Sequence, residues 1–152
     1  MKSIKFIYKT AVIVILVLSL MQCDKEVKPD VITSDLEKAQ QDMLAKLSAS
    51  TWQITNFKRD GLDATAEFTN FKLTIGKQNY STQSGAHLWP ASGTWQFVEG
   101  KSTQVVRDDE VIIDVVLDDS PLSLLFKFDE NIFTTGGRGQ TVSSSLEFVL
   151  TN

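Results

Sequence analysis

From Thr51 onward, the chain is built of short stretches in which apolar and polar residues alternate, and turn-forming residues separate these stretches. A period of two places the apolar side chains of a β-strand on one face and the polar side chains on the other. The turn signals include Asp60-Gly61, Gly76-Lys77 and Asp118-Asp119. About eight short strands, joined mostly as hairpins, therefore predict an all-β fold.

The alternation also identifies the side chains that should face a common core. The expected inward residues are Phe71, Leu73, Ile75, Trp95, Phe97, Val111, Ile113, Val115, Leu117, Leu122, Leu124, Phe126, Phe128, Leu146, Phe148 and Leu150. Asn131–Val142, which contains Gly136-Gly137-Arg138-Gly139, is predicted as a loop. A meander of this kind closes into a small antiparallel up-and-down barrel that leaves no edge exposed, and a two-sheet β-sandwich is the alternative.

One helix is predicted before the strands, over residues 34–48. Ser34 and Glu37 fit a capping box, and the apolar residues recur at helical spacing on one face. We expect this helix to pack against the β domain, which we place at 33–152; docking on a partner or on a membrane surface is the alternative. Residues 23–32 are polar and contain Pro29, so they are predicted to be a flexible tether.

The first 22 residues have the form of an export signal. Lys2, Lys5 and Lys9 precede an apolar run from 11 to 21, which is shorter than the ~20 residues of a membrane-spanning helix. Leu20-Met21-Gln22-Cys23 resembles a bacterial lipobox, although Gln22 departs from the usual small residue. The resemblance implies a lipoprotein signal peptide over 1–22 and a lipid on Cys23. It thereby implies a protein anchored in the bacterial cell envelope, in the outer membrane, and facing the periplasm or the surface.

Composition narrows the classes of partner. Removal of residues 1–22 leaves 130 of the 152 residues, enough for one domain with a proper core. The leader holds three of the 15 basic residues and no acidic ones, so 12 basic residues remain against 19 acidic ones, a net charge of −7. This balance disfavours nucleic acid as a partner. Because Cys23 is the only cysteine, the domain has no disulfide.

No pattern of residues points to catalysis or to a cofactor. His87 is the only histidine, and no serine lies in a G-x-S-x-G context, so we expect no enzyme, no catalytic residue and no zinc site. Asp108-Asp109-Glu110 and Asp129-Glu130 should lie at one end of the barrel, opposite Asp118-Asp119. They are interpreted as solvated turn residues rather than calcium ligands.

Two segments resemble lipocalin-like domains of small bacterial lipoproteins. Ser50-Thr51-Trp52 resembles the first-strand G-x-W motif, without its glycine, and Ser92-Gly93-Thr94-Trp95-Gln96-Phe97 resembles a mid-barrel strand. The resemblance implies that Trp52 plugs one end of the barrel and that an arginine stacks on it, for which Arg138 is the candidate. It also implies that the barrel holds an apolar ligand.

The residues leave two functional hypotheses from different classes. One is non-covalent binding of a small apolar ligand or peptide in or at the mouth of the barrel. Its candidate residues are His87, Trp89, Tyr80, Trp95 and Trp52, and the mouth near His87 and Trp89 is the expected location. The other is a structural accessory lipoprotein with a filled barrel, which docks on another envelope protein. A cavity of ~300–1,000 Å³ would favour the first hypothesis. A filled interior with an exposed apolar patch would favour the second.

Overall fold

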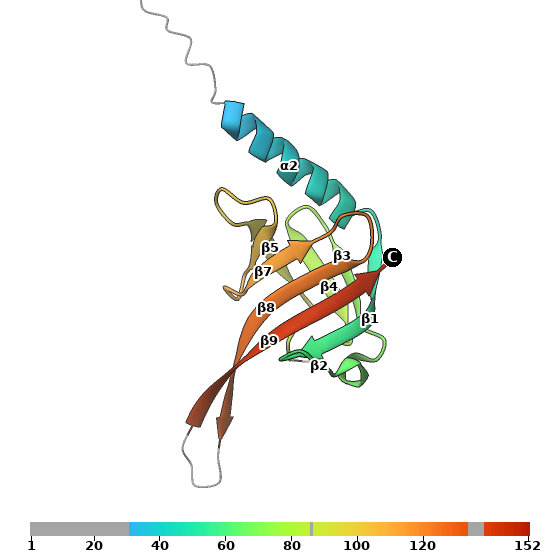
Figure 1. The fold of residues 1–152 in the computed structure, drawn as a ribbon, viewed down its shortest axis with the longest axis vertical. Helices are drawn as coiled ribbons and strands as arrows, with labels where there is room; N and C mark the ends of the chain where they lie inside the picture. The colour runs from blue at the N-terminus through green and yellow to red at the C-terminus, as the bar shows by residue number, and fades with distance from the viewer. Residues whose placement is uncertain (1–30, 86, 134–138) are drawn as a thin grey trace, which may run out of the picture. The chain divides into compact units, whose positions relative to one another are not determined.

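A computed structural model describes residues 31–85, 87–133 and 139–152 (Figure 1). Its elements are α2 (Val31–Leu47), β1 (Thr51–Arg59), β2 (Leu62–Asp63), a 3₁₀ helix η1 (Thr65–Phe68), β3 (Lys72–Ile75), β4 (Asn79–Gln83), β5 (Ser92–Phe97), β6 (Gln104–Arg107), β7 (Ile112–Val116), β8 (Leu122–Phe133) and β9 (Gly139–Thr151). The predicted leader, Cys23 and most of the predicted tether lie outside the described residues.

The described strands form a closed antiparallel barrel. Each barrel strand pairs with the next along the chain, from β1 and β3 through to β9, and β9 pairs back onto β1. Eight strands take part in this ring, while the two-residue β2 pairs only with the end of β1. The closure confirms the predicted up-and-down barrel and excludes the β-sandwich.

Helix α2 packs across one end of the barrel, which we call the helix end. Leu47 is buried, and Met43 and Leu44 pack against the core. The Gln40 side chain donates a hydrogen bond to the Lys101 carbonyl, and the Lys46 ammonium donates one to the Asp118 carbonyl. The helix thus packs against the domain as predicted, although it begins at Val31 rather than at residue 34.

The opposite end differs from the prediction in two segments. The alternation predicts a strand over residues 68–75, but Phe68 belongs to η1, Asn70 adopts a left-handed backbone conformation (φ +65°), and β3 begins only at Lys72. The predicted loop Asn131–Val142 is also wrong in extent. β8 and β9 continue as a paired hairpin to Phe133 and Gly139, so only residues 134–138 lie between them.

The distal half of this hairpin leaves the barrel, as Figure 1 shows. We call it the ribbon, residues 127–133 and 139–144, and we call this end of the barrel the ribbon end. Pairing of β7 with β8 stops at Ile113 and Phe126, and pairing of β1 with β9 stops at Arg59 and Leu146. Among the described strands, the two strands of the ribbon therefore pair only with each other.

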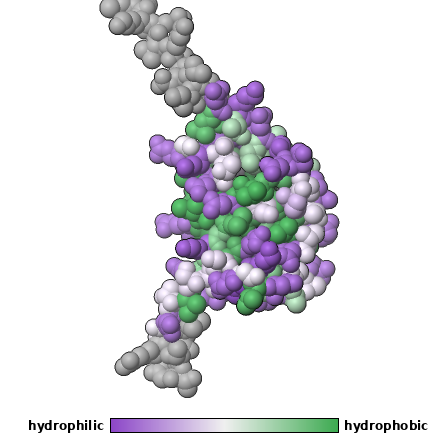
Figure 2. Space-filling view, in the orientation of Figure 1, coloured by the Kyte–Doolittle hydropathy of each residue, from purple (hydrophilic) through white to green (hydrophobic). Residues whose placement is uncertain are grey.

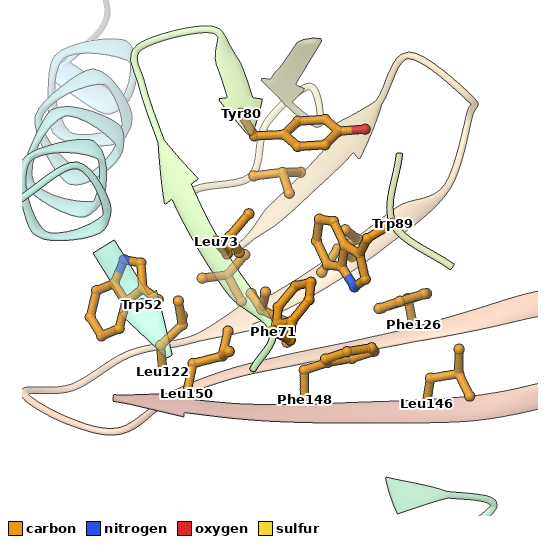
Figure 3. Close-up of a cluster of buried hydrophobic side chains, with 14 of the residues drawn as sticks. Trp52, Phe71, Leu73, Tyr80, Trp89, Leu122, Phe126, Leu146, Phe148 and Leu150 are labelled. Atoms are coloured by element: carbon orange, nitrogen blue, oxygen red, sulfur yellow. The ribbon is translucent and has the colours of Figure 1, made fainter. Parts of the chain in front are cut away.

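The core of the barrel is centred on Phe148, which is fully buried. Its ring lies 4.6 Å from that of Phe57, 4.9 Å from that of Phe68 and 5.8 Å from that of Phe126, measured between centroids. Leucine and tryptophan side chains fill the helix end of the interior (Figure 3). All the side chains predicted to face inward are buried or packed against this cluster.

Candidate functional site

Trp52 and Trp95, two of the predicted ligand-binding residues, have structural roles. The Trp52 indole N–H donates a 2.8 Å hydrogen bond to the Leu47 carbonyl at the end of α2, and its ring is 2% exposed. The Trp95 N–H lies between the Gly76 and Asn79 carbonyls, at 3.1 and 3.2 Å. Both donors are therefore satisfied by the protein itself, and Trp52 is buried against the end of α2.

Tyr80 is buried against the strand beside it. It lies opposite Gly93, and a Cβ atom at position 93 would meet the Tyr80 hydroxyl at 2.6 Å. The glycine of the Ser92–Phe97 segment is therefore required by the Tyr80 ring that covers it. The hydroxyl is buried and has no hydrogen-bond partner among the described residues. Burial raises the pKa of the Tyr80 phenol, and the charge of Arg107 offsets only part of that rise.

Trp89 lies in the core rather than at an open mouth, which corrects the sequence-based expectation. The loop over residues 84–91 folds back into the barrel, so that Leu88 is fully buried and Trp89 is 3% exposed. The Trp89 ring lies 5.9 Å from the Phe71 ring and 5.8 Å from that of Tyr80 (Figure 3). The sequence shows no alternation in this segment, so nothing local indicated that its two large residues fill the barrel.

Arg107 holds this loop in place. It is not among the candidate residues predicted from the sequence. Its guanidinium is buried, lies 4.6 Å above the Trp89 ring and donates a 3.0 Å hydrogen bond to the Leu88 carbonyl. It also forms a two-pronged ion pair with Asp109. The alternation along β6 could have indicated its position. Arg107 follows the inward residue Val105 by two positions, so its side chain lies on the same face of the strand.

The charge of Arg107 also sets the titration of its partner. Burial acts to raise the pKa of Asp109, but the hydrogen bonds and the positive charge of Arg107 outweigh it, so this pKa lies below its ordinary value. An arginine does stack on a tryptophan here, but on Trp89 rather than on Trp52. Arg138 lies outside the described residues.

His87 is the exposed member of the predicted set. Its Nε2 lies 2.5 Å from a carboxylate oxygen of Glu130, and its side chain is 61% exposed. Arg59 lies 3.8 Å from the same carboxylate and 3.0 Å from that of Glu67. These contacts connect the loop 84–91, the base of the ribbon and η1, but no nucleophile takes part in them.

The barrel interior is nearly filled. Among the described residues it contains a cavity of about 40 Å³, with an apolar wall to which Leu73, Trp89, Trp95 and Ile113 contribute. Ligand pockets for small molecules usually measure ~300–1,000 Å³. A closed barrel is a fold that can enclose a ligand, but with Trp89 in this position the room left is close to that of a single water molecule, ~30 Å³.

A larger hollow lies on the outside of the barrel, near the ribbon end. It measures about 1,000 Å³ and runs between the start of β7, the base of the ribbon and the end of β1. Ile112 and Leu125 supply apolar surface and are 54% and 36% exposed. Glu110, Asp114 and Asp129 supply carboxylates. We call this hollow the outer groove.

The described residues contain neither a cluster of metal ligands nor a membrane-spanning helix. No three histidine, cysteine or carboxylate side chains in the described ranges come together as a metal site would require. As predicted, however, Asp109, Glu110 and Asp129 lie at the same end of the barrel. No helix in this part of the chain is both long and apolar enough to cross a membrane.

Comparison with known proteins adds no relative. No protein-family model matches the chain, and a search of curated proteins found no match. The structure itself defines a small eight-stranded up-and-down β-barrel preceded by a helix, which is consistent with a lipocalin-like fold.

Proposed function

We propose that this protein is a non-catalytic, lipid-anchored accessory protein of the bacterial cell envelope, which docks its outer surface on another envelope protein. The observation that carries the proposal is the contrast between a barrel interior that is nearly filled and an outer surface that exposes large apolar side chains. Ile112, Val116 and Leu125 project outward from neighbouring strands and are 54%, 52% and 36% exposed. Figure 2 shows hydrophobic side chains gathered on this face of the molecule. Large apolar side chains that gather on one exposed face are typical of an interaction site.

The anchor in this proposal rests on the residues around Cys23. A diacylated or triacylated cysteine gives stable attachment, whereas a single chain binds only marginally. Replacement of Cys23 by Ser should move the protein from the membrane fraction to the soluble fraction. If Cys23→Ser protein remains with the membrane, the lipid anchor is not the means of attachment.

Photo-crosslinking in intact cells of the natural host tests the docking. A photoreactive amino acid at Leu125 of the full-length chain should yield one dominant protein adduct. The same amino acid at Ser81, an exposed residue of β4 outside the outer groove, is the matched control and should yield none. No adduct from Leu125, or the same adducts from both positions, would contradict the proposal.

Binding of a small apolar ligand inside the barrel is the second candidate. The apolar wall of the 40 Å³ cavity favours it, because withdrawal of Trp89 with its loop would enlarge an already apolar space. Native mass spectrometry of the protein purified from its host would then show an additional mass that disappears on unfolding. A bare protein mass, with no binding from a lipid extract, would leave only the docking proposal.

A further inference from the structure

We propose that the free edge of β8 in the ribbon binds an extended, basic segment of a partner protein by β-strand addition, beside the outer groove. This inference rests on the docking function proposed above and names its surface and the chemistry of its partner. The carrying observation is that β8 has a strand on each side up to Phe126 and only β9 beyond it.

The backbone of this edge is available for pairing. In an antiparallel sheet, alternate residues direct both their N–H and their C=O groups to the same neighbouring strand. From Lys127 to Phe133, the groups directed away from β9 meet no other described strand. Such an edge is a template for a further strand, and strand addition is a recurring mode of peptide recognition.

The outer groove lies along the same edge. Its wall includes Lys127, Phe128 and Asp129 of β8 on one side and Glu110 to Ile112 on the other. A strand added to β8 would continue the sheet into the space where β7 has not yet begun. Its side chains on one face would then lie next to Ile112 and Leu125, the two exposed apolar residues of the groove.

The charges beside the free edge of β8 determine which residues a bound partner strand should carry. Glu147 is paired with Lys58 at 3.1 Å, and Asp109 is paired with Arg107. Glu110, Asp114 and Asp129 remain, and in the described residues none of them forms an ion pair. The basic residues of the groove lining are Lys127 and Lys58, and Lys58 is already paired with Glu147. This acidic surface complements a strand that alternates basic and apolar residues.

The same charges disfavour a second copy of this chain as the occupant. Antiparallel pairing of two 127–133 edges about their centre would bring Glu130 of one copy opposite Glu130 of the other, and like charges in facing positions are destabilising. The edge therefore favours a partner over itself.

Binding of a synthetic peptide to the purified full-length protein in detergent tests the inference. The probe is a fluorescent octapeptide of alternating lysine and valine, and its glutamate–valine counterpart is the charge control. The lysine–valine peptide should bind and should shift the backbone amide signals of residues 127–131. A lysine–valine peptide with N-methylated alternate amides keeps its charge but loses its strand hydrogen bonds, so it should not bind.

One pair of variants tests the position of the site. Asp129→Lys should weaken binding of the lysine–valine peptide by about threefold to tenfold, because a facing opposite-charge pair becomes a like-charge pair. Asp119→Lys makes the same change in charge at the helix end and should leave binding unchanged. Equal binding of the N-methylated peptide, or equal effects of the two variants, would overturn strand addition. Self-association of the protein that competes with the peptide would also overturn it.

The outcome separates the two proposals. If Leu125 crosslinks to an envelope protein but the peptide does not bind, docking stands and strand addition is wrong. If Leu125 gives no specific adduct, the docking function fails whatever the peptide does.

Discussion

Strands β8 and β9 pass through two environments, and the contrast between them separates what stabilises the fold from what is free to bind. In the barrel, Leu124 and Phe126 of β8 are at most 6% exposed and have a paired strand on each side. A few residues later, Lys127 and Asp129 are exposed and have one partner strand. An isolated two-stranded hairpin is only marginally stable in water, so the ribbon depends on the barrel for its order.

The largest expected effect tests the barrel side of the comparison between barrel and ribbon, and it comes from removal of the aromatic ring of Phe148. Phe148→Ala should lower the free energy of unfolding by about 3–5 kcal/mol, since it deletes a fully buried aromatic residue that contacts several others. Urea denaturation followed by circular dichroism measures this loss. A loss below about 1 kcal/mol would place the stabilising core elsewhere.

The next effect concerns the arginine inside the barrel. Arg107→Met should cost about 2 kcal/mol, because the Leu88 carbonyl loses its donor and Asp109 loses its cation. We expect less than the full cost of breaking a buried ion pair, since the Asp109 side chain is 38% exposed. Tryptophan fluorescence should also change as the loop that carries Trp89 loosens. Arg59→Met removes a more exposed ion pair and is the control, with an expected loss below about 1 kcal/mol.

A smaller effect follows from the same ion pair as the pH falls. The pKa of Asp109 in the folded protein lies below the value of 3.8 for an unperturbed side chain. Its carboxylate therefore contributes stability that is fully present above pH 3.8 and is lost as the pH falls through the lower, folded-state pKa. Thermal unfolding between pH 5 and pH 2 should show a smaller acid-induced loss in Asp109→Asn than in the native protein. An identical loss in both would show that Asp109 does not contribute.

The smallest effect should come from the ribbon. Val142→Ala shortens a side chain that is already 38% exposed, so the free energy of unfolding should fall by less than about 0.5 kcal/mol. The amides of residues 127–131 should also exchange hydrogen faster than those of 122–126, because they belong to the less stable part of the same strand. Equal protection along β8 would remove the distinction between barrel and ribbon.

Much of the fold could be predicted because apolar and polar residues alternate along most of its strands. The inward faces of β7, β8 and β9 follow from their sequences alone, since a strand has two faces and only one can be buried here. The turn at Asp60-Gly61 could also be predicted from the residue pair, and both residues adopt the positive φ angles that this pair favours. The side of α2 that packs on the barrel also followed from its spacing.

The candidate site was less predictable. Of the five residues proposed for a ligand, Trp52 and Trp95 serve the barrel itself, and Trp89 occupies the space that a ligand would need. Their residue types were informative about burial and aromatic packing, but tryptophan lines a pocket and fills a core equally well. Only the distance between opposite walls distinguishes these roles.

The sequence by itself determined the strand order, the inward faces, the helix and the absence of a disulfide. Tertiary structure alone decided between the closed barrel and the β-sandwich, paired Arg107 with Asp109 beneath the loop of residues 84–91, and continued the hairpin past the barrel to Phe133. The physical reason is the range of the interactions. Alternation acts between neighbours along the chain, whereas closure, buried charge and a free strand edge depend on segments that meet only after the barrel has formed.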